Sequence, residues 1–314
     1  MRLKSQKLLK EAKAFDNIVK KRVIKGFDPY IYSNKINNFF YNNPWRYPLS
    51  KKLSVKKKLD FVLSECKKND KVLEVGCGLG TLSMELAKKN IKVLAIDISE
   101  KSLKYAKKFS RKNLLKKNYE NINFKKLAIS DIYNNRNLKF DKIIFFKTLH
   151  HLPNVDNLMK KIKINLKKNG KIIIVEPFRS EFKYLNAVIA YIIRKLSTTW
   201  ISKKKKMKNN SIKTIENEIN NIFKEYKYIE NKRGFDQSPM DNVTSSLEKV
   251  LNALKKNYSI KKISYQDAFK DKIIGGIYGD NKENEMKFID NLDNFLIKKK
   301  ILPGSTAMIV AQKK

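Results

Sequence analysis

The sequence predicts an α/β fold, a doubly wound sheet of about seven strands, and three observations lead to this fold class. Residues 71–75 form a short apolar segment that runs directly into a glycine-rich turn. Strand-like and helix-like segments alternate along the following hundred residues, which is the pattern of a parallel sheet with helices on both faces. Residues 140–146 are almost continuously apolar, as expected for a strand that is covered on both faces.

The first 50 residues are predicted to form a helical and aromatic extension ahead of the sheet. Apolar residues recur at helical spacing in its first half, and aromatic rings crowd its second half. Such a segment suits a lid over a planar or apolar substrate, whereas the alternative is that the rings only dock the N-terminus on the core. The stripe consists of Leu8, Leu9, Ala12, Phe15, Ile18, Val19 and Val23, and the rings are Phe27, Tyr30, Tyr32, Phe39, Phe40, Tyr41, Trp45 and Tyr47.

The glycine-rich turn reads E-x-G-x-G-x-G and is the most informative motif of the chain. Glycines let the backbone turn tightly and approach a ligand where a Cβ would clash. A dinucleotide fingerprint would need another glycine where Thr81 stands, and no G-K-[ST] ending of a triphosphate loop occurs in the sequence. The next strand, residues 92–96, ends at Asp97, where nucleotide-binding sheets hold a ribose hydroxyl. The residues of the motif are Glu74, Gly76, Gly78 and Gly80.

This turn and the acid after the second strand resemble motif I and its partner acid in the class I S-adenosylmethionine-dependent methyltransferases, in particular the small-molecule enzymes. The resemblance implies S-adenosylmethionine as the cofactor and a Rossmann-like sheet whose last strand is antiparallel. It also implies that the glycine loop, from Glu74 to Gly80, meets the methionine part of the cofactor. Asp97, with Ile98 beside it, is then expected to hold the ribose.

The resemblance extends to two further loops. The strand at residues 121–127 leads into I-S-D-I, where family members place an acid against the adenine amino group. This implies Asp131 and Ile132 as cofactor contacts, although an ordinary turn or cap role is the alternative. Residues 147–153 read K-T-L-H-H-L-P, which is similar to the L-H-H-L-P signature of many small-molecule methyltransferases. Lys147 is therefore added to the expected cofactor contacts.

Later elements complete the expected sheet. A helical pattern over residues 155–166 runs into the cationic stretch 167–170, whose glycine is a stop signal. A fifth strand is expected at residues 171–175, a helix at 283–298 and a closing strand at 307–311.

The resemblance is strong over residues 51–178 and looser over 256–314, so one methyltransferase domain is expected at residues 51–314. Residues 179–255 are far longer than a usual connection between a strand and a helix. Family members often carry substrate-binding insertions here, and we expect the same of this segment.

The formal net charge of +40 raises the question of a nucleic-acid partner. Only eight of the 70 basic residues are Arg, the residue that gives bidentate contacts, so nucleic acid is less favoured. An AT-rich coding sequence would explain the surplus of Lys without any function, and attraction to anionic membranes or RNA is the alternative. The two cysteines form neither a disulfide framework nor a zinc pattern, so no metal site is expected.

The N-terminus lacks the apolar run of a signal peptide, and a cytoplasmic location is expected. Residues 184–193 are apolar but reach only about half the length of a membrane span. Trp200 and the lysine run 203–206 follow, as in helices that lie at a membrane surface, so peripheral membrane contact is an alternative. A buried helix of the insertion is the favoured interpretation.

A hydroxyl acceptor must lose a proton during methyl transfer, and histidine is the natural base near neutral pH. The chain has two histidines, His150 and His151, both in the loop that the resemblance places at the methyl group. We expect a catalytic role for His151, then His150, with Glu176 after the fifth strand as a further candidate. A structural role is the alternative for each.

These observations predict a methyltransferase that acts on an oxygen of a small or lipid-linked metabolite. The loop at residues 147–153 lacks the Asn/Asp-Pro-Pro-aromatic motif of amine-directed adenine enzymes, and the cysteines of pyrimidine-directed enzymes are missing. An RNA methyltransferase that uses the basic surface and a non-catalytic scaffold that binds the cofactor are the alternatives. The sequence gives no prediction of the oligomeric state.

Overall fold

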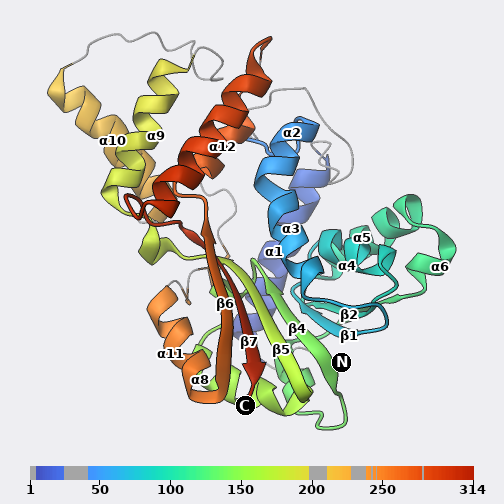
Figure 1. Cartoon of the computed structure of the whole chain (residues 1–314). Coiled ribbons are helices and arrows are strands. Elements are labelled where there is room, and N and C mark those ends of the chain that lie inside the picture. The colour runs from blue at the N-terminus through green and yellow to red at the C-terminus, as the bar shows by residue number, and fades with distance from the viewer. Residues whose placement is uncertain are drawn as a thin grey trace.

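A computed structural model describes residues 5–24, 42–197, 211–227, 238–241, 243–244, 246–277 and 279–314. Within these residues, seven strands form one sheet in the order β3-β2-β1-β4-β5-β7-β6 (Figure 1). Strands β1 to β5 are parallel and β7 is antiparallel to both neighbours, which confirms the predicted fold. The strands are β1 (Lys71–Val75), β2 (Lys92–Asp97), β3 (Ile122–Lys126), β4 (Phe140–Phe146), β5 (Leu166–Pro177), β6 (Tyr258–Gln266) and β7 (Thr306–Lys313).

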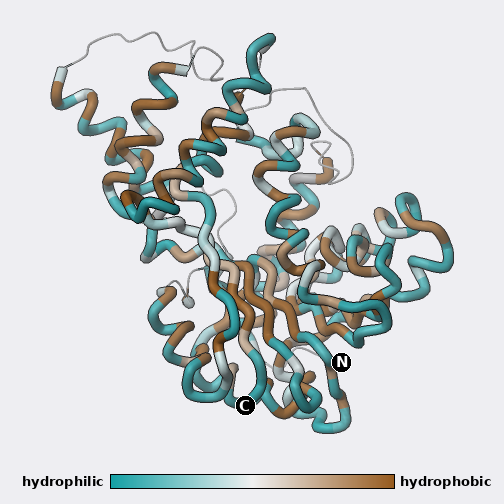
Figure 2. Tube along the Cα trace, in the orientation of Figure 1, coloured by the Kyte–Doolittle hydropathy of each residue, from teal (hydrophilic) through white to brown (hydrophobic). Residues whose placement is uncertain are grey.

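Helices cover both faces of the sheet because successive strand residues point to opposite sides. On one face, Val72 packs into a cluster with residues of α3 (Lys57–Ser64), α4 (Thr81–Lys88) and α5 (Glu100–Asn113). On the other face, Leu73 packs with residues of α7 (Ile129–Tyr133), α8 (Val155–Ile162) and α11 (Leu247–Asn257). Figure 2 shows the apolar residues concentrated in the central strands, with hydrophilic residues outside.

A third apolar cluster lies beyond the carboxyl ends of the parallel strands, where Figure 1 shows three helices above the sheet. These helices are α9 (Tyr184–Leu196), α10 (Ile212–Lys227) and α12 (Lys282–Lys298). Helices α9, α10 and α11 all belong to the long connection between β5 and β6. The expected insertion therefore contributes to this cluster and to one face of the sheet, whereas the division at residue 50 stays a prediction.

The N-terminal stripe forms the helix α1 (Gln6–Ile24), which packs against α5. Short elements then lead into the sheet. They are α2 (Pro48–Lys51) and the π-helical turn η1 (Lys52–Lys56). A further short helix, α6 (Lys116–Tyr119), follows α5.

The prediction for residues 167–170 was wrong. Instead of ending a helix, these residues belong to β5, and α8 already ends at Ile162. The buried Asn165 amide donates to three backbone carbonyls, of Ile132, Asn135 and Leu138, and this stops the helix earlier than the charge pattern suggests. The register between β4 and β5 shifts in this region, and Asn169 rather than the glycine adopts the left-handed conformation.

Several predicted features lie outside the described residues. They include the aromatic residues between positions 27 and 41, Trp200 and the lysine run 203–206. The lid and the membrane-surface helix therefore stay predictions. Within the described part of the chain, no helix is long and apolar enough to cross a membrane.

Candidate active site

The carboxyl ends of β1, β2 and β4 meet where the strand order reverses, between β1 and β4, and this is where open α/β sheets bind ligands. A cavity of about 610 Å³ lies at this edge, a volume typical of small-molecule sites. Residues of α1, including Leu8, Phe15 and Val19, form another part of its wall. The predicted site residues that line the cavity are Glu74, Gly76, Gly78, Asp97, Ile98, Lys147 and His151.

The three glycines of the turn all have positive φ angles, but they serve different needs. A Cβ on Gly76 would lie 2.4 Å from Cγ2 of Thr148, so this glycine lets the loop after β4 approach. A Cβ on Gly80 would press on Phe124 and Ala106 at 3.2 Å, which explains why the start of α4 needs a glycine. A Cβ on Gly78 would meet nothing within 4 Å, because this residue faces the open cavity.

Asp97 ends β2 and organises the glycine turn. Its Oδ2 accepts a hydrogen bond from the amide of Gly78 at 2.9 Å, and its Oδ1 accepts one from the amide of Ser99 at 2.8 Å. Burial raises the pKa of Asp97, although these hydrogen bonds oppose the shift. The carboxylate thus lies in the cavity wall with lone pairs left for a ribose hydroxyl.

Glu74 precedes the turn and is 2% exposed. Its carboxyl group accepts a short hydrogen bond from the Ser83 hydroxyl on α4. Burial, with a smaller contribution from the charge of Asp97, raises the pKa of Glu74 to about 8. The side chain is therefore protonated at neutral pH and links β1 to α4. Burial also raises the pKa of the neighbouring Cys77 thiol, which leaves it unreactive.

The loop after β3 contributes to the cavity through Ala128, Ile129 and Ser130. The predicted residues take other positions. The Asp131 carboxylate accepts a hydrogen bond from the Ala128 amide at 2.9 Å, as a cap of α7, and Ile132 is fully buried in the core. A contact of either residue with adenine stays a prediction.

Lys147 follows β4 in a left-handed conformation, with φ of 55°. Its side chain lines the cavity, and its amide donates to the Val175 carbonyl at 2.8 Å. The surrounding protein lowers the pKa of Lys147 to about 8, because desolvation and then the charge of Lys58 disfavour the ammonium form.

Glu176 is fully buried beneath the loop that carries the histidines. Its Oε2 accepts hydrogen bonds from the amides of Thr148 at 2.9 Å and Leu149 at 2.7 Å. Its Oε1 lies 2.5 Å from Nδ1 of His150. Burial alone would lower the pKa of His150, but the charge of Glu176 and this hydrogen bond raise it. Neither side chain lines the cavity, so their contacts point to holding the loop in place.

His151 is the histidine that reaches the cavity. Its Nδ1 lies 3.2 Å from Oε1 of Glu11, an α1 residue that is 1% exposed, and 3.3 Å from the Ser238 hydroxyl. Glu11 also accepts hydrogen bonds from the Ser238 hydroxyl at 2.5 Å and from the Met240 amide at 2.8 Å. These contacts outweigh the effect of burial and keep the pKa of Glu11 below its usual value.

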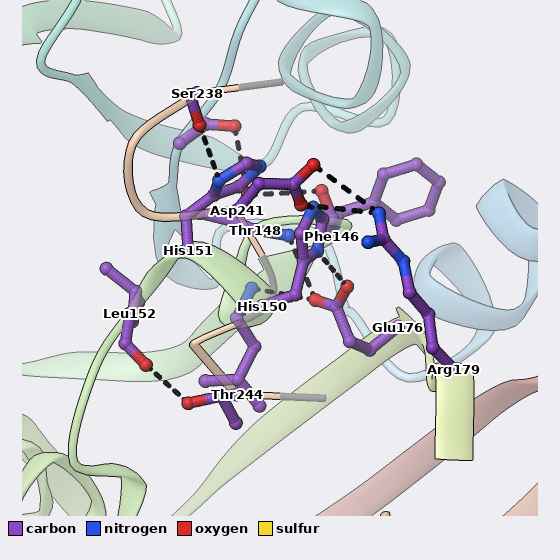
Figure 3. A network of polar contacts seen from close by, with 12 residues as sticks. Phe146, Thr148, His150, His151, Leu152, Glu176, Arg179, Ser238, Asp241 and Thr244 are labelled. Carbon is purple, nitrogen blue, oxygen red and sulfur yellow. Dashed lines mark hydrogen bonds and ion pairs between the residues drawn. The ribbon is translucent and has the colours of Figure 1, made fainter. Parts of the chain in front are cut away.

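Asp241 completes the polar cluster around the two rings, which Figure 3 shows lying against each other. The centroids of His150 and His151 are 4.0 Å apart. One carboxylate oxygen of Asp241 lies 3.8 Å from Nε2 of His150 and 3.3 Å from Nη2 of Arg179. The segment that contains Asp241 is attached to the loop, since the Thr244 hydroxyl donates to the carbonyl of residue 152 at 2.5 Å.

The helix α1 is fixed at both ends of the cavity. At the end beside His151, Glu11 makes the contacts described above. At the other end, Asp16 Oδ1 accepts hydrogen bonds from the Ser99 hydroxyl at 2.6 Å and the Lys101 amide at 2.9 Å. Ser99 is also a partner of Asp97, so α1 bridges the region of Asp97 and that of His151.

The residues of the cavity fit S-adenosylmethionine. Gly78 leaves space where a ligand can approach the backbone, Asp97 offers acceptors for ribose hydroxyls, and the cavity is large enough for the cofactor and a small acceptor. Gly76, Gly78 and Asp97 would hold the cofactor on this wall.

Four side chains of the polar cluster were not predicted from the sequence. Glu11 has a usable signal, because an acid stands three residues after Leu8 and four before Phe15, within the apolar stripe. Arg179, Ser238 and Asp241 lie in the long connection after β5, Arg179 in the short 3-10 helix η4 (Arg179–Glu181) and the other two outside helices and strands, and no periodic pattern marks them.

Comparison with known proteins gives one family. A profile for the family described as "Methyltransferase domain" matches residues 66–234, more than half of the chain. The Ubiquinone biosynthesis O-methyltransferase of Pelagibacter ubique (strain HTCC1062) is 32% identical over 129 residues, 40% of this chain and 51% of that protein. Its namesake from Acinetobacter baumannii (strain ACICU) is 27% identical over 128 residues, 40% of this chain and 52% of that protein. The chain thus matches about half the length of these relatives.

Solved structures share the fold at low identity. The cyclase SpnF aligns with a TM-score of 0.55 and 12% identity, covering 100% of this chain and 98% of that chain. The geranyl diphosphate C-methyltransferase from Streptomyces coelicolor A3(2), solved with S-adenosyl-L-homocysteine, aligns with a TM-score of 0.53 and 10% identity over 100% of both chains.

Proposed function

The chain belongs to the class I S-adenosylmethionine-dependent methyltransferases, and on this premise we propose that it transfers a methyl group to an oxygen of a small or lipid-linked acceptor. The observation that carries the proposal is one continuous cavity, lined by Gly78 and Asp97 on the cofactor side and by His151 on another. A methyl donor and a hydroxyl acceptor can therefore meet beside an imidazole.

His151 is the residue that we assign to the acceptor hydroxyl. In its neutral form, a ring that donates its Nδ1 proton to Glu11 keeps a lone pair on Nε2. Glu11 is thus a positioning residue, since it fixes the tautomer, and Phe15 packs edge-on against the same ring at 5.0 Å. This arrangement supports His151 as the general base over His150, whose Nδ1 and Nε2 already face Glu176 and Asp241.

The other residues hold the cofactor and the loop in position and keep water out of the cavity. When bound, S-adenosylmethionine supplies the electrophilic methyl group. The glycine turn and Asp97 hold the cofactor side, and Glu176 fixes the backbone of residues 148 and 149. Leu8, Val19 and Trp45 are among the apolar side chains that exclude water from the cavity.

The acceptor class follows from the apolar wall and from the names of the relatives. An acceptor with an aromatic or apolar body fits a cavity of this lining, and the two relatives named above are O-methyltransferases of ubiquinone biosynthesis. We therefore place hydroxylated aromatic compounds first, with and without a lipid tail.

The test is transfer of a labelled methyl group to a panel of hydroxylated aromatic compounds and to bulk RNA. We expect label on the aromatic hydroxyls. His151→Ala should lower turnover by roughly 10²- to 10⁴-fold, the usual contribution of a general base, while calorimetry shows unchanged affinity for S-adenosylmethionine. Glu11→Gln should give a smaller loss, because glutamine still accepts a hydrogen bond. Label on RNA alone, or full turnover by His151→Ala, would contradict the proposal.

A further inference from the structure

We propose that His150, His151 and Asp241 form a binding site for one divalent transition-metal ion, of the Zn²⁺ or Co²⁺ type, at the acceptor end of the cavity. One ligand atom from each of the three residues lies within 4.8 Å of the other two. The inference rests on the proposed function, because it places the ion where the acceptor oxygen would arrive.

The surroundings of both imidazoles have the arrangement found in metal sites. Histidine ligands almost always donate their second ring nitrogen to a carboxylate or carbonyl, which orients the ring and raises its basicity. Here Nδ1 of His150 faces Glu176 at 2.5 Å, and Nδ1 of His151 faces Glu11 at 3.2 Å. Both glutamates are buried and come from different elements, β5 and α1. A neutral ring that carries its proton on Nδ1, as these contacts require, keeps its Nε2 lone pair for an ion.

The charges of the cluster also call for a cation. Three carboxylates, of Glu11, Glu176 and Asp241, and one guanidinium, of Arg179, surround the two rings. With neutral imidazoles, the carboxylates exceed the guanidinium by two negative charges, and the ammonium of Lys147, whose charge interacts with Glu176, offsets part of this excess. A divalent cation would neutralise this excess. Protonation of both rings would do the same, and it is the competing explanation that the experiment must exclude.

The donor set selects the kind of ion. Two imidazole nitrogens and one carboxylate suit Zn²⁺, Co²⁺ or Fe²⁺, whereas Mg²⁺ and Ca²⁺ prefer oxygen ligands alone. Nε2 of His150 and Oδ1 of Asp241 are 3.8 Å apart. Two ligands at roughly 2 Å from one ion in a tetrahedral site stand about 3.3 Å apart, so this pair must close by about half an ångström, and a pair at the 4.8 Å limit of the three-residue cluster by about 1.5 Å. Arg179 now holds the same Asp241 oxygen and must yield it to the ion.

The ion would define the acceptor more closely. Three protein ligands leave at least one position open, as in catalytic zinc sites, and His151 brings the site to the cavity wall. The site would take acceptors with two neighbouring oxygens, such as vicinal hydroxyl groups, and would lower the pKa of the hydroxyl that binds. The bound hydroxyl would then lose its proton to solvent, and His151 would serve the same O-directed transfer as a ligand in place of the base.

The experiment uses the full chain, stripped of metal by dialysis against a chelator, and titrated with Co²⁺ while visible absorption is recorded. We expect one equivalent of Co²⁺ to give ligand-field bands of a nitrogen and oxygen site, and Zn²⁺ to displace it. Asp241→Asn and His150→Ala should abolish the bands, and Glu11→Gln should weaken binding roughly 10- to 100-fold. Arg179→Met should strengthen it, because the competing cation is removed.

Asp60→Asn is the matched control, since this exposed carboxylate on α3 pairs with Lys56 at the surface and should leave the bands unchanged. Absence of a Co²⁺ signal, or a signal that survives both Asp241→Asn and His150→Ala, would overturn the inference and leave protonated rings as the explanation. Methyl transfer at full rate by metal-stripped protein would also overturn the role of the ion while supporting His151 as the base, so the two proposals fail separately.

Discussion

The contrast between Gly76 and Gly78 gives a sharp prediction, because the two glycines of one motif have different surroundings. Both φ angles are positive, +69° and +52°, so an alanine at either position costs roughly 1–2 kcal/mol of stability in the left-handed conformation. At Gly76 the new Cβ would also collide with Thr148 at 2.4 Å, which adds roughly 1–3 kcal/mol of overpacking. Gly78→Ala should therefore be the milder change for the fold.

Gly78 should matter more for cofactor binding than for the stability of the fold. Its Cβ would enter the open cavity where the backbone meets the ligand. We expect Gly78→Ala to weaken S-adenosylmethionine at least tenfold, or about 1.4 kcal/mol, in calorimetric titration. Urea denaturation of both variants gives the stability comparison, with unmodified protein as the reference.

Two results would refute this reasoning. Wild-type affinity in Gly78→Ala would mean that the cofactor does not approach the turn at this residue. Equal stability of the two alanine variants would mean that the contact between Gly76 and Thr148 is looser than its geometry indicates.

Three further predictions concern charged residues. Glu74→Gln should reduce the loss of stability that the protein shows between about pH 4.5 and 8. The folded-state pKa of Glu74, about 8, lies above the ordinary 4.5, so in this window the carboxyl is protonated in the folded protein alone, and the folded state is destabilised as pH rises. Urea denaturation at pH 5 and 8 checks this, and an unchanged difference in stability would contradict it. Lys147→Gly should keep or slightly raise the thermal stability, since glycine removes a left-handed strain of about 1 kcal/mol, yet weaken cofactor binding; a marked loss of stability would show that its side chain holds the fold. Lys58→Met should cost roughly 3 kcal/mol, because Asp267 loses the ammonium 2.7 Å away in a buried site and keeps the more distant one of Lys270 at 4.0 Å, and Asp267→Asn should recover part of this loss in the double variant.

The sheet could be predicted because its signals are local. Apolar runs such as residues 140–146, the glycine turn and the acid at position 97 each depend on neighbours in sequence, and their order along the chain fixes a parallel sheet. The end of α8 could not be predicted, because it depends on Asn165 bonding to three distant carbonyls. A cationic stretch followed by glycine looked like a helix end, but pairing with β4 decided its conformation.

The candidate site likewise has one part that the sequence predicts and another part that it does not. The cofactor side lies within one continuous stretch of motif, and Asp97 follows one unit later, so spacing alone brought these residues together. The acceptor side is assembled from α1, the loop after β4 and the connection after β5. Glu11 and Asp241 are 230 positions apart in the chain, and only the tertiary structure puts both beside the histidines. Their roles in catalysis stay predictions.

The two carboxylates of α1 have a consequence for how the two walls of the cavity depend on each other. Asp16 anchors the helix beside the cofactor wall, and Glu11 anchors it beside the acceptor wall, through separate partners. Loss of one anchor leaves the helix attached by the other. Because one helix is held on both walls, any displacement of α1 would change the cavity beside Asp97 and beside His151 together.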